Sequence, residues 1–319
     1  MKLVVTGGCG FIGTNFIHYI LNKYPDYSVI NIDKITYAGH PENLEIWENN
    51  PRYKLVLMDI NDEKVENFIK ECDTIVHFAA ESHVDNSILS ADEFIKTNVN
   101  GTYNLLKYAL KYKKRFHHIS TDEVFGSLPL DSKKKFNETT RYNPRNPYSA
   151  SKASADHLVR CYFETYGLPV TISNCSNNYG PYQNKGSFLP KVILNILSGQ
   201  KVPVYGDGLN VRDWIFVEDH CSAIDLIIHN GVIGETYCIG GLLADYNNLT
   251  ILNMVADILK QDSIQNLFEF VPDRIGHDRR YAVDWSKIHR ELGWKPKCNF
   301  EESLIKTVNW YKQKFNLEK

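Results

Sequence analysis

The sequence predicts an α/β protein with a doubly wound parallel sheet and a smaller C-terminal domain. Short β-rich runs alternate with segments whose apolar residues recur at helical spacing, and parallel strands need crossover connections of this kind. A glycine-rich turn follows the first of these runs, at the position where such sheets bind ligands. The 319 residues suffice for two domains, at about 150 residues per domain.

The first half of the chain carries most of the expected sheet. Short apolar runs predict strands over residues 3–6, 28–32, 53–57, 74–78, 116–120 and 170–173. We expect helices between them, including 94–108 and 150–166, so that both faces of the sheet are covered.

The composition changes after residue 175. Residues 174–213 are rich in Asn, Gly, Pro and Tyr, and helices are expected over 217–229 and 250–259. We therefore predict a first domain over 1–175 with a return over 213–245, in which Thr236–Ile239 rejoins the sheet. The second domain is predicted over 176–212 and 246–319.

Charge and composition exclude several classes of partner. The chain has 36 basic and 38 acidic side chains and a net charge of −2, which favours neither nucleic acid nor an anionic membrane. No stretch approaches the roughly 18 apolar residues of a membrane helix. The first residues enter a strand pattern without a signal segment, so we expect a cytoplasmic protein. Seven scattered cysteines without a C-x-x-C pair predict reduced thiols, and no metal site is expected.

The segment TGGCGFIG, residues 6–13, stands where the first strand is expected to end and a helix to begin. Gly7, Gly10 and Gly13 allow a tight turn that brings a pyrophosphate close to the N–H groups of the helix N-terminus. Asp33 follows Gly13 by 20 residues, and a carboxylate there accepts hydrogen bonds from a ribose and repels a 2′-phosphate. The spacing predicts a Rossmann-like domain that binds NAD rather than NADP. A structural glycine turn with a surface aspartate is the alternative.

Two further strand ends belong to the predicted cofactor site. Asp59 and Ile60 follow the third strand, and Asp59 is placed to bind the adenine amino group. Ala79 and Ala80 follow the fourth strand, where small side chains let the cofactor pass close to the backbone. A helix cap or ordinary core packing is the alternative for each.

Tyr148 and Lys152 stand four residues apart and therefore share one face of a helix. An isolated pair of this kind is usually structural, but here it follows a predicted NAD-binding half. A neighbouring ammonium and the cation of NAD both favour the phenolate, which can remove a hydroxyl proton.

Eight motifs carry a resemblance to a known family. They are TGGCGFIG (6–13), DKITYAG (33–39), FAAESHVD (78–85), STDEVFG (120–126), YSASK (148–152), NNYGPY (177–182), RDW (212–214) and DRIGHDRRY (273–281). Over essentially its whole length the chain resembles the extended short-chain dehydrogenase/reductases, and among them the dTDP-glucose 4,6-dehydratases. The resemblance adds Phe11, Ile12, Lys34, Ser82 and Asn98 to the expected NAD contacts.

The triplet Thr121-Asp122-Glu123 distinguishes this chain from related enzymes of the same family. Related epimerases lack the Asp-Glu pair, and related decarboxylases keep the Glu but lack the Asp. The resemblance implies oxidation of carbon 4 of the hexose, elimination of water across carbons 5 and 6, and hydride return to carbon 6. Glu123 is the expected base at carbon 5 and Asp122 the expected acid for the leaving hydroxyl, because adjacent buried carboxyls resist simultaneous ionisation. Thr121 is expected to orient the carbon 4 oxygen, and Lys152 to hold the nicotinamide ribose.

The resemblance also implies a nucleoside diphosphate hexose as substrate. Arg212, Arg274, His277 and Asn178 match diphosphate contacts, and Asn247 or Asn248 is expected at the nucleoside. The remaining expected substrate contacts are Ser82, His83, Thr121 and Ser187.

Departures from the family pattern leave the nucleotide open. Asn86 replaces an arginine of the family, and Gly186-Ser187 stand where the family has a Glu-Lys pair. dTDP-glucose is favoured, with UDP-glucose as an alternative substrate. A 4-epimerase, a decarboxylase and an NAD-binding protein without turnover are the alternative functions.

The helices expected near 94–111 and 149–166 carry apolar residues around much of their circumference. A helix that is apolar on two faces must bury both. By resemblance these helices are expected to form the four-helix interface of a homodimer. Burial against the second domain of the same chain is the alternative.

Overall fold

The computed structural model describes residues 1–241, 246–261 and 266–317. Its main element is a seven-stranded, entirely parallel sheet in the order β11-β6-β5-β4-β1-β2-β3. The strands are β1 (Lys2–Thr6), β2 (Ser28–Asp33), β3 (Tyr53–Leu57), β4 (Thr74–His77), β5 (Arg115–Thr121), β6 (Val170–Cys175) and β11 (Thr236–Ile239). The predicted doubly wound α/β fold is therefore confirmed.

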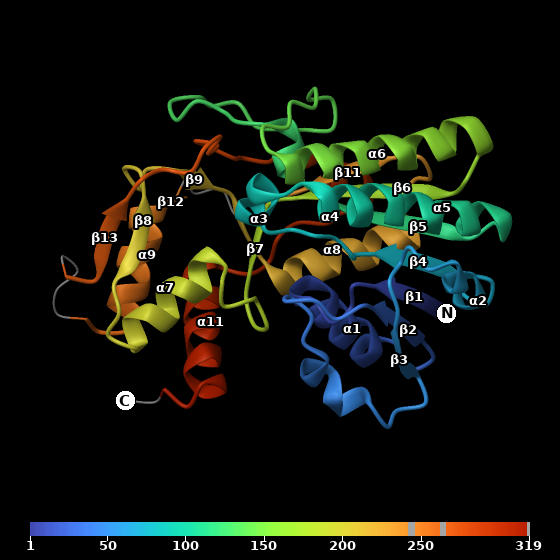
Figure 1. Cartoon of the computed structure of the whole chain (residues 1–319), viewed down its shortest axis with the longest axis horizontal. Coiled ribbons are helices and arrows are strands. Elements are labelled where there is room, and N and C mark those ends of the chain that lie inside the picture. Colours follow the sequence, from blue (N-terminus) through green and yellow to red (C-terminus); the bar gives the residue numbers. More distant parts are fainter. Residues whose placement is uncertain (242–245, 262–265, 318–319) are drawn as a thin grey trace.

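Helices cover both faces of this sheet (Figure 1). One layer holds α1 (Phe11–Lys23) and α8 (Val217–Asn230), and the other holds α2 (Glu66–Ile69), α5 (Thr102–Lys111) and α6 (Pro147–Tyr166). Alternate residues of β1 point to opposite layers, as the pleat requires: Leu3 and Val5 pack with α1 and α8, and Val4 packs with α5 and α6. The edge strand β3 is the exception to two-sided burial, since the side chain of Leu57 there is 71% exposed.

The helix expected over 94–108 is not uniform. It consists of α4 (Asp92–Phe94), a π-helical segment η3 (Ile95–Gly101) and α5. Asn98 lies in the π-helical segment, and its side chain bonds the backbone of Glu81 and the hydroxyl of Ser151. The widened turn thus fastens this layer to the chain that follows β4. Such segments occur often at functional sites.

A second lobe lies beside the carboxyl ends of the sheet strands (Figure 1). Its core joins three helices, α7 (Phe188–Leu197), α9 (Asn248–Ile258) and α11 (Phe300–Lys314). Around them lie three strand pairs: β7 (Asn177–Tyr179) with β10 (Trp214–Phe216), β9 (Val211–Arg212) with β12 (Tyr246–Asn247), and β8 (Val202–Tyr205) with β13 (Phe268–Val271).

The short elements connect these parts. They are η1 (Pro41–Trp47), η2 (Glu63–Val65), α3 (Val84–Leu89), η4 (Asp122–Phe125) and α10 (Ser286–Leu292). α10 belongs to the range predicted for the second domain, yet Ile288 packs in one cluster with residues of β11 and α8. Residues 242–245, the end of the predicted return over 213–245, lie outside the described residues. No helix in the described part of the chain has the length and apolar character to cross a membrane.

Candidate active site

Two adjoining cavities lie at the carboxyl ends of the parallel strands. The first, of about 350 Å³, is lined by the glycine turn and by the ends of the central strands. The second, of about 480 Å³, lies between the sheet and the second lobe. They form one cleft, because they share the lining residues Ser82, Glu123, Asn177, Asn178, Gln183 and Ser187.

The glycine turn at the floor of the first cavity tolerates no side chain. A Cβ on Gly7, which has φ +71°, would lie 2.6 Å from the backbone of Ala79, and one on Gly13 would lie 2.4 Å from the oxygen of Gly7. Gly10 provides no side-chain cap for α1, so the N–H groups of the first turn of this helix are left for another acceptor. Backbone N–H groups at a bare helix N-terminus fit a pyrophosphate.

Asp33 stands at the end of β2, beside the glycine turn. Its carboxylate accepts hydrogen bonds from the backbone N–H of Cys9 and of Ile35, both at 2.9 Å. These bonds fix the carboxylate in the cavity wall, where it fits the hydroxyls of a ribose. Burial raises the pKa of Asp33, and the two N–H donors oppose that rise. The residues present thus fit NAD.

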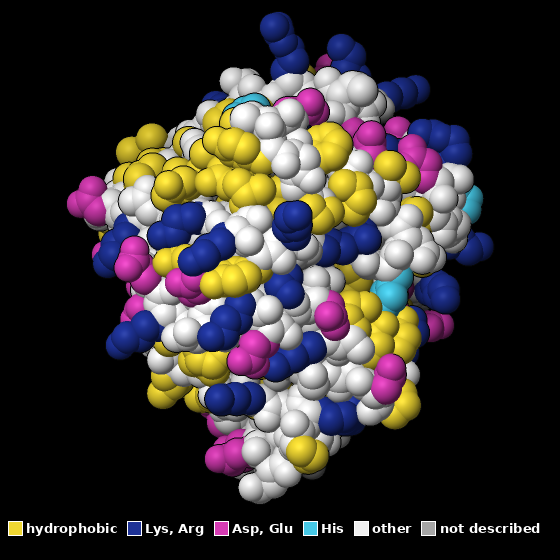
Figure 2. All heavy atoms as spheres, turned by 90° about the vertical axis from the view of Figure 1, so that its right-hand side faces the viewer, with side chains coloured by type: hydrophobic (Ala, Val, Ile, Leu, Met, Phe, Trp, Pro, Cys, Tyr) yellow, Lys and Arg dark blue, Asp and Glu magenta, His cyan; other side chains and the backbone are white. Residues whose placement is uncertain are grey.

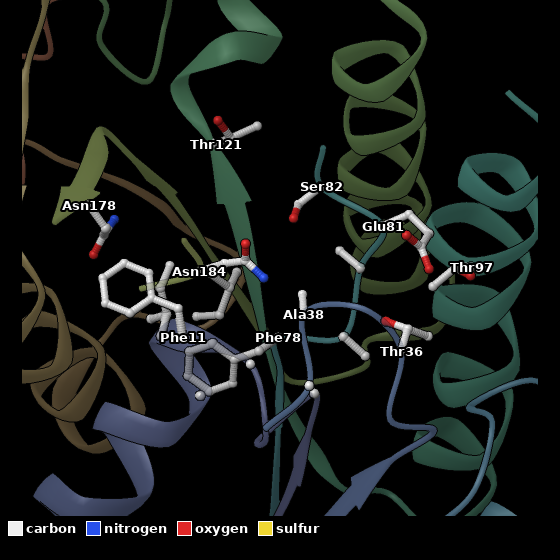
Figure 3. A pocket seen from close by; sticks show the side chains of 18 of the residues that line it. Phe11, Thr36, Ala38, Phe78, Glu81, Ser82, Thr97, Thr121, Asn178 and Asn184 are labelled. Carbon is white, nitrogen blue, oxygen red and sulfur yellow. The ribbon is translucent and has the colours of Figure 1, made fainter. Parts of the chain in front are cut away.

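Most predicted site residues line the cleft (Figure 3). The first cavity holds Gly7, Gly10, Phe11, Ile12, Gly13, Asp33, Lys34, Ile60, Ala79, Ala80, Ser82, Thr121, Glu123, Tyr148, Lys152, Asn178 and Ser187. The second holds Ser82, His83, Glu123, Asn178, Ser187, Arg212, Asn248, Arg274 and His277.

Four predicted residues do not line either cavity, and three of them hold neighbouring parts of the structure. Asp59 accepts hydrogen bonds from the backbone and side chain of Asn61. Asn98 bonds the backbone of Glu81, which lines the cavity, and the hydroxyl of Ser151. Asn247 caps α9 through bonds from Thr250, so only its neighbour Asn248 faces the cleft. Asp122 is 2% exposed and lies behind Thr121 and Glu123.

Several lining residues were missed by the sequence analysis: Thr36, Ala38, Phe78, Glu81, Thr97, Gln183 and Asn184. The last two belong to a strap, residues 181–187, that joins both lobes. Asn184 donates a hydrogen bond to the carbonyl of Tyr37, and Tyr311 of α11 donates one to the carbonyl of Gln183. These contacts join residues more than 100 positions apart, and no local pattern signals them.

The catalytic candidates meet at the end of β5 and the start of α6. Thr121 ends β5 and caps η4, with its hydroxyl accepting from the N–H of Glu123 at 3.2 Å. The first turn of α6 is held by a capping box between Asn146 and Ser149. Tyr148 lines the cleft in that turn, and Lys152 lines it one turn later. This rigid start of a helix fixes the phenol and the ammonium relative to the strand end.

Burial dominates the charges of this cluster. It raises the pKa of Tyr148 well above 10.0, with Glu123 adding to the rise, and lowers the pKa of Lys152 to about 8. Lys152 alone therefore does not make Tyr148 a phenolate, and the prediction accordingly includes the positive charge of NAD beside that of Lys152. Burial also raises the pKa of Glu123, against the opposing charge of Arg212. Asp122 is shifted furthest into its protonated form, by burial and by the charges of Glu123 and Asp213.

The second cavity is lined by cations. The guanidinium of Arg274 pairs with the carboxylate of Asp85 through two nitrogens, at 2.5 and 3.0 Å, and so bridges the two lobes. Arg212 lies over the ring of Tyr281 and donates to the carbonyl of Asp278. Planar guanidiniums in fixed positions suit a diphosphate. The described residues contain no group of His, Cys, Asp and Glu side chains that could hold a metal ion.

Comparison with known proteins shows the family of this chain. Residues 4–307 match the family model described as GDP-mannose 4,6 dehydratase. The chain is 49% identical over 314 residues to a dTDP-glucose 4,6-dehydratase of Mycobacterium tuberculosis, covering 98% of this chain and 93% of that protein. It is 48% identical over 333 residues to one of Haemophilus influenzae, covering 98% of each.

Solved structures give the same result at the level of the fold. The dTDP-glucose 4,6-dehydratase of Streptomyces venezuelae, solved with NAD bound, superposes with a TM-score of 0.95 at 43% identity over the full length of both chains. A UDP-glucose 4-epimerase of Thermotoga maritima reaches a TM-score of 0.90 at 28% identity, covering 99% of this chain and 100% of that one. The fold alone therefore does not separate dehydration from epimerisation.

Proposed function

This chain belongs to the dTDP-glucose 4,6-dehydratases of the extended short-chain dehydrogenase/reductase family, and we propose that it removes water from dTDP-glucose, with NAD as cofactor, to form the 4-keto-6-deoxy sugar. The observation that carries the proposal is the pair Asp122-Glu123 beside Thr121 and Tyr148. One carboxyl faces the cleft, and the other is buried behind it and favours its protonated form. Epimerisation at carbon 4 needs neither a base at carbon 5 nor an acid at carbon 6.

The first cavity would hold NAD. The glycine turn and the N-terminus of α1 would bind its pyrophosphate, Asp33 a ribose, and Lys152 the nicotinamide ribose. Bound there, NAD would supply the acceptor for the hydride of carbon 4 of the hexose and, once reduced, the donor of that hydride to carbon 6.

The side chains of this protein move the protons. Tyr148 removes the proton of the carbon 4 hydroxyl, and Thr121 hydrogen-bonds the same oxygen. The ketone at carbon 4 acidifies the hydrogen at carbon 5, which Glu123 removes as a proton and gives back to carbon 5 once the hydride has returned to carbon 6. Asp122 supplies the proton with which the carbon 6 hydroxyl leaves as water. Because Asp122 lies behind the cavity wall in this structure, the acid step requires its side chain to turn toward carbon 6.

The second cavity would hold the nucleoside diphosphate. Arg212, Arg274 and His277 would bind the diphosphate and Asn248 the nucleoside. Of the departures from the family pattern, Gly186 and Ser187 line this cavity and Asn86 does not. The choice between dTDP and UDP thus depends on residues 186–187. We assign the cofactor to the domain 1–175 with its return and the nucleotide to the remaining ranges.

The proposal includes a homodimer. Large apolar side chains are exposed on the helices between residues 84 and 166: Ile88, Leu89, Ile95, Tyr103 and Tyr166. Figure 2 shows an apolar band on the face whose upper part holds α5 and α6 in Figure 1. A second copy of this chain would cover α5 and α6 in a four-helix interface. Sedimentation of a monomer at micromolar concentration would contradict this.

A cytoplasmic location also belongs to the proposal. All seven cysteines are free thiols, and five of them are buried. Buried free thiols are typical of proteins from reducing compartments.

Incubation of the purified protein with dTDP-glucose and with UDP-glucose tests the function. We expect a product lighter by one water, with the alkali-induced absorbance of a 4-keto sugar, and a higher kcat/KM for dTDP-glucose. A product of unchanged mass would indicate a 4-epimerase, and no product from either sugar with NAD bound would refute the proposal.

A further inference from the structure

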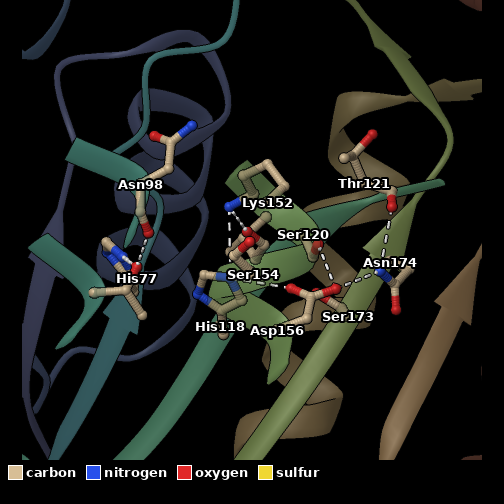
Figure 4. A network of polar contacts seen from close by, with 12 residues as sticks. His77, Asn98, His118, Ser120, Thr121, Lys152, Ser154, Asp156, Ser173 and Asn174 are labelled. Atoms are coloured by element: carbon tan, nitrogen blue, oxygen red, sulfur yellow. Dashed lines mark hydrogen bonds and ion pairs between the residues drawn. The ribbon is translucent and has the colours of Figure 1, made fainter. Parts of the chain in front are cut away.

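A buried aspartate lies one helical turn behind the catalytic lysine. Asp156 of α6 is fully buried, and its Oδ2 accepts hydrogen bonds from Ser120 at 2.9 Å and Asn174 at 3.2 Å (Figure 4). The hydroxyl of Tyr142 donates a third bond to Oδ2 at 2.8 Å. The other carboxylate oxygen of Asp156, Oδ1, lies 3.3 Å from Nε2 of His118. Although burial raises the pKa of Asp156, its contact with His118, the charge of Lys152 and the hydrogen bond from Tyr142 hold it below its ordinary value, so the group is a carboxylate.

The same histidine also contacts the lysine. Nζ of Lys152 lies 3.5 Å from Nε2 of His118 and donates a hydrogen bond to the carbonyl of Ile119 at 2.7 Å (Figure 4). Burial lowers the pKa of His118 to about 4, so this ring is neutral and contributes no charge. Burial raises the pKa of the neighbouring Cys175 thiol to about 12, so it too is neutral. The anion that acts on Lys152 is therefore Asp156.

The reaction requires the proton to be lost from a particular group. When the pair of Tyr148 and Lys152 loses one proton, that proton can come from either side chain. Loss from Tyr148 leaves a phenolate beside an ammonium, and loss from Lys152 leaves a phenol beside a neutral amine. Only the first form can take the proton of a sugar hydroxyl. Burial favours the second, because it raises the pKa of Tyr148 and lowers that of Lys152 to about 8.

We propose that Asp156 is a positioning residue that keeps the proton on Lys152 when Tyr148 gives up its own. The carboxylate attracts the ammonium, so it favours the phenolate form of the pair without touching substrate or cofactor. This inference rests on the proposed function. It assigns the buried hydrogen bonds around Asp156 a role in proton transfer in addition to their role in packing. The same bonds also tie α6 to the strand end that carries Thr121, since Asn174 donates both to Asp156 and to the carbonyl of Thr121.

The other histidines and the tyrosine near the cluster do not change charge near neutral pH. Burial lowers the pKa of His77 and of His117 well below 6.5 and raises that of Tyr142. Around Lys152 and Asp156, the charged and titratable groups of the described residues include His77 on β4, His117 and His118 on β5, Cys175 on β6, Tyr148 and Arg160 on α6, and Tyr142 in the preceding loop. On the cleft side, Asp122 and Glu123 of η4 act on Tyr148 and raise its pKa further.

Asp156→Asn tests the proposal in the full chain with NAD bound. Removing the carboxylate makes the pair lose its first proton more readily, so the apparent pKa of the oxidation step should fall by about one unit. That proton should now leave Lys152, so the rate on the alkaline plateau should fall about tenfold or more. Single turnovers of dTDP-glucose deuterated at carbon 4, followed by the absorbance of the reduced nicotinamide, give both quantities.

A spectroscopic measurement reports the phenolate without turnover. The ultraviolet difference between each protein and its Tyr148→Phe counterpart isolates one of the 19 tyrosines. Its phenolate signal should shrink in Asp156→Asn. Tyr142→Phe is the matched control, because it removes one hydrogen bond to Asp156 but leaves the negative charge of the carboxylate. In this variant the apparent pKa of the oxidation step should stay at the wild-type value.

A double-mutant cycle separates charge from structure. Arginine does not lose its proton, so Asp156→Asn should have little effect on the phenolate signal in a Lys152→Arg background. A slower Asp156→Asn enzyme with an unchanged apparent pKa would overturn the proposal and leave Asp156 a structural residue. If Asp156→Asn does not fold, Asp156→Glu serves as the test. Glutamate keeps the negative charge, so the apparent pKa of the oxidation step should stay at the wild-type value. A wild-type enzyme that forms no reduced nicotinamide would instead count against the proposed function.

Discussion

Asp122→Asn should stabilise the folded protein while it stops the elimination of water. In the structure Asp122 is 2% exposed, its Oδ2 has no hydrogen-bond partner, and its Oδ1 accepts only a weak bond from Thr121 at 3.4 Å. Glu123 and Asp213 act on it as like charges. The surroundings therefore favour a neutral side chain at this position, and asparagine is neutral with almost the same shape.

The size of the effect follows from proton linkage. In the unfolded chain the carboxyl titrates near its ordinary pKa of 3.8, whereas burial, Glu123 and Asp213 raise the folded pKa well above that value. A raised folded pKa gives stability that is fully present below pH 3.8 and is lost as the pH rises toward the folded pKa. Between the unfolded and the folded pKa, the loss is about 1.4 kcal/mol for each pH unit. The Asp122→Asn variant would not incur this loss, so at roughly 2 °C per kcal/mol its Tm should gain about 3 °C on wild type for each of these pH units.

Thermal unfolding of both proteins with NAD bound, over a series of pH values, measures this difference. The gap in Tm should widen from acidic to neutral pH, while Asp122→Asn forms the reduced nicotinamide but little 4-keto-6-deoxy sugar. Asp219→Asn is the matched control, because the Asp219 carboxylate accepts backbone N–H bonds from Lys297 and Cys298 at 2.9 to 3.1 Å, and its loss should destabilise the fold by about 1–3 kcal/mol. A constant gap in Tm would mean that Asp122 is ionised in the fold and is not the acid.

Two further substitutions test the two ends of the cleft. Gly13→Ala places a Cβ 2.4 Å from a backbone oxygen of the glycine turn, so we expect at least tenfold weaker NAD binding, measured as NAD retained after gel filtration. Gly167→Ala, whose Cβ would meet nothing within 4 Å, should retain NAD. Arg274→Ala should raise KM for dTDP-glucose about 10- to 100-fold with little change in kcat, since a charge-assisted bond contributes about 1.5–3 kcal/mol. Arg279→Ala, which removes an exposed partner of Asp207 outside both cavities, should leave KM near wild type; equal effects of the two would refute the diphosphate assignment.

The fold was predictable where short-range patterns decide it. Alternating strand and helix periods predicted all seven strands of the parallel sheet to within two residues at each end. The π-helical segment was not predictable, because its apolar spacing resembles that of an α-helix and its widening depends on contacts of Asn98 with distant residues. The strand pairs of the second lobe are two to four residues long, too short for a period to emerge.

The site was predictable where motifs carry it. The glycine turn, Asp33, Tyr148 and Lys152 all line the cleft. Spacing could not show which way a side chain turns, so it did not separate Asn248 in the cleft from Asn247 at the helix cap. The buried carboxylate of Asp156 gave no sequence signal, since an aspartate two turns after a tyrosine is ordinary on any helix.

The cleft also limits when the enzyme becomes active during its synthesis. Arg274 pairs with Asp85 across 189 positions, and Tyr311 secures Gln183 across 128. A ribosome-bound chain can complete its glycine turn early, but Arg274 and His277, which are proposed to bind the diphosphate, are synthesised only in the last fifth of translation. Nascent chains therefore pass through most of their elongation unable to capture a sugar nucleotide, and truncation near the C-terminus should remove substrate binding before it removes the cofactor fold.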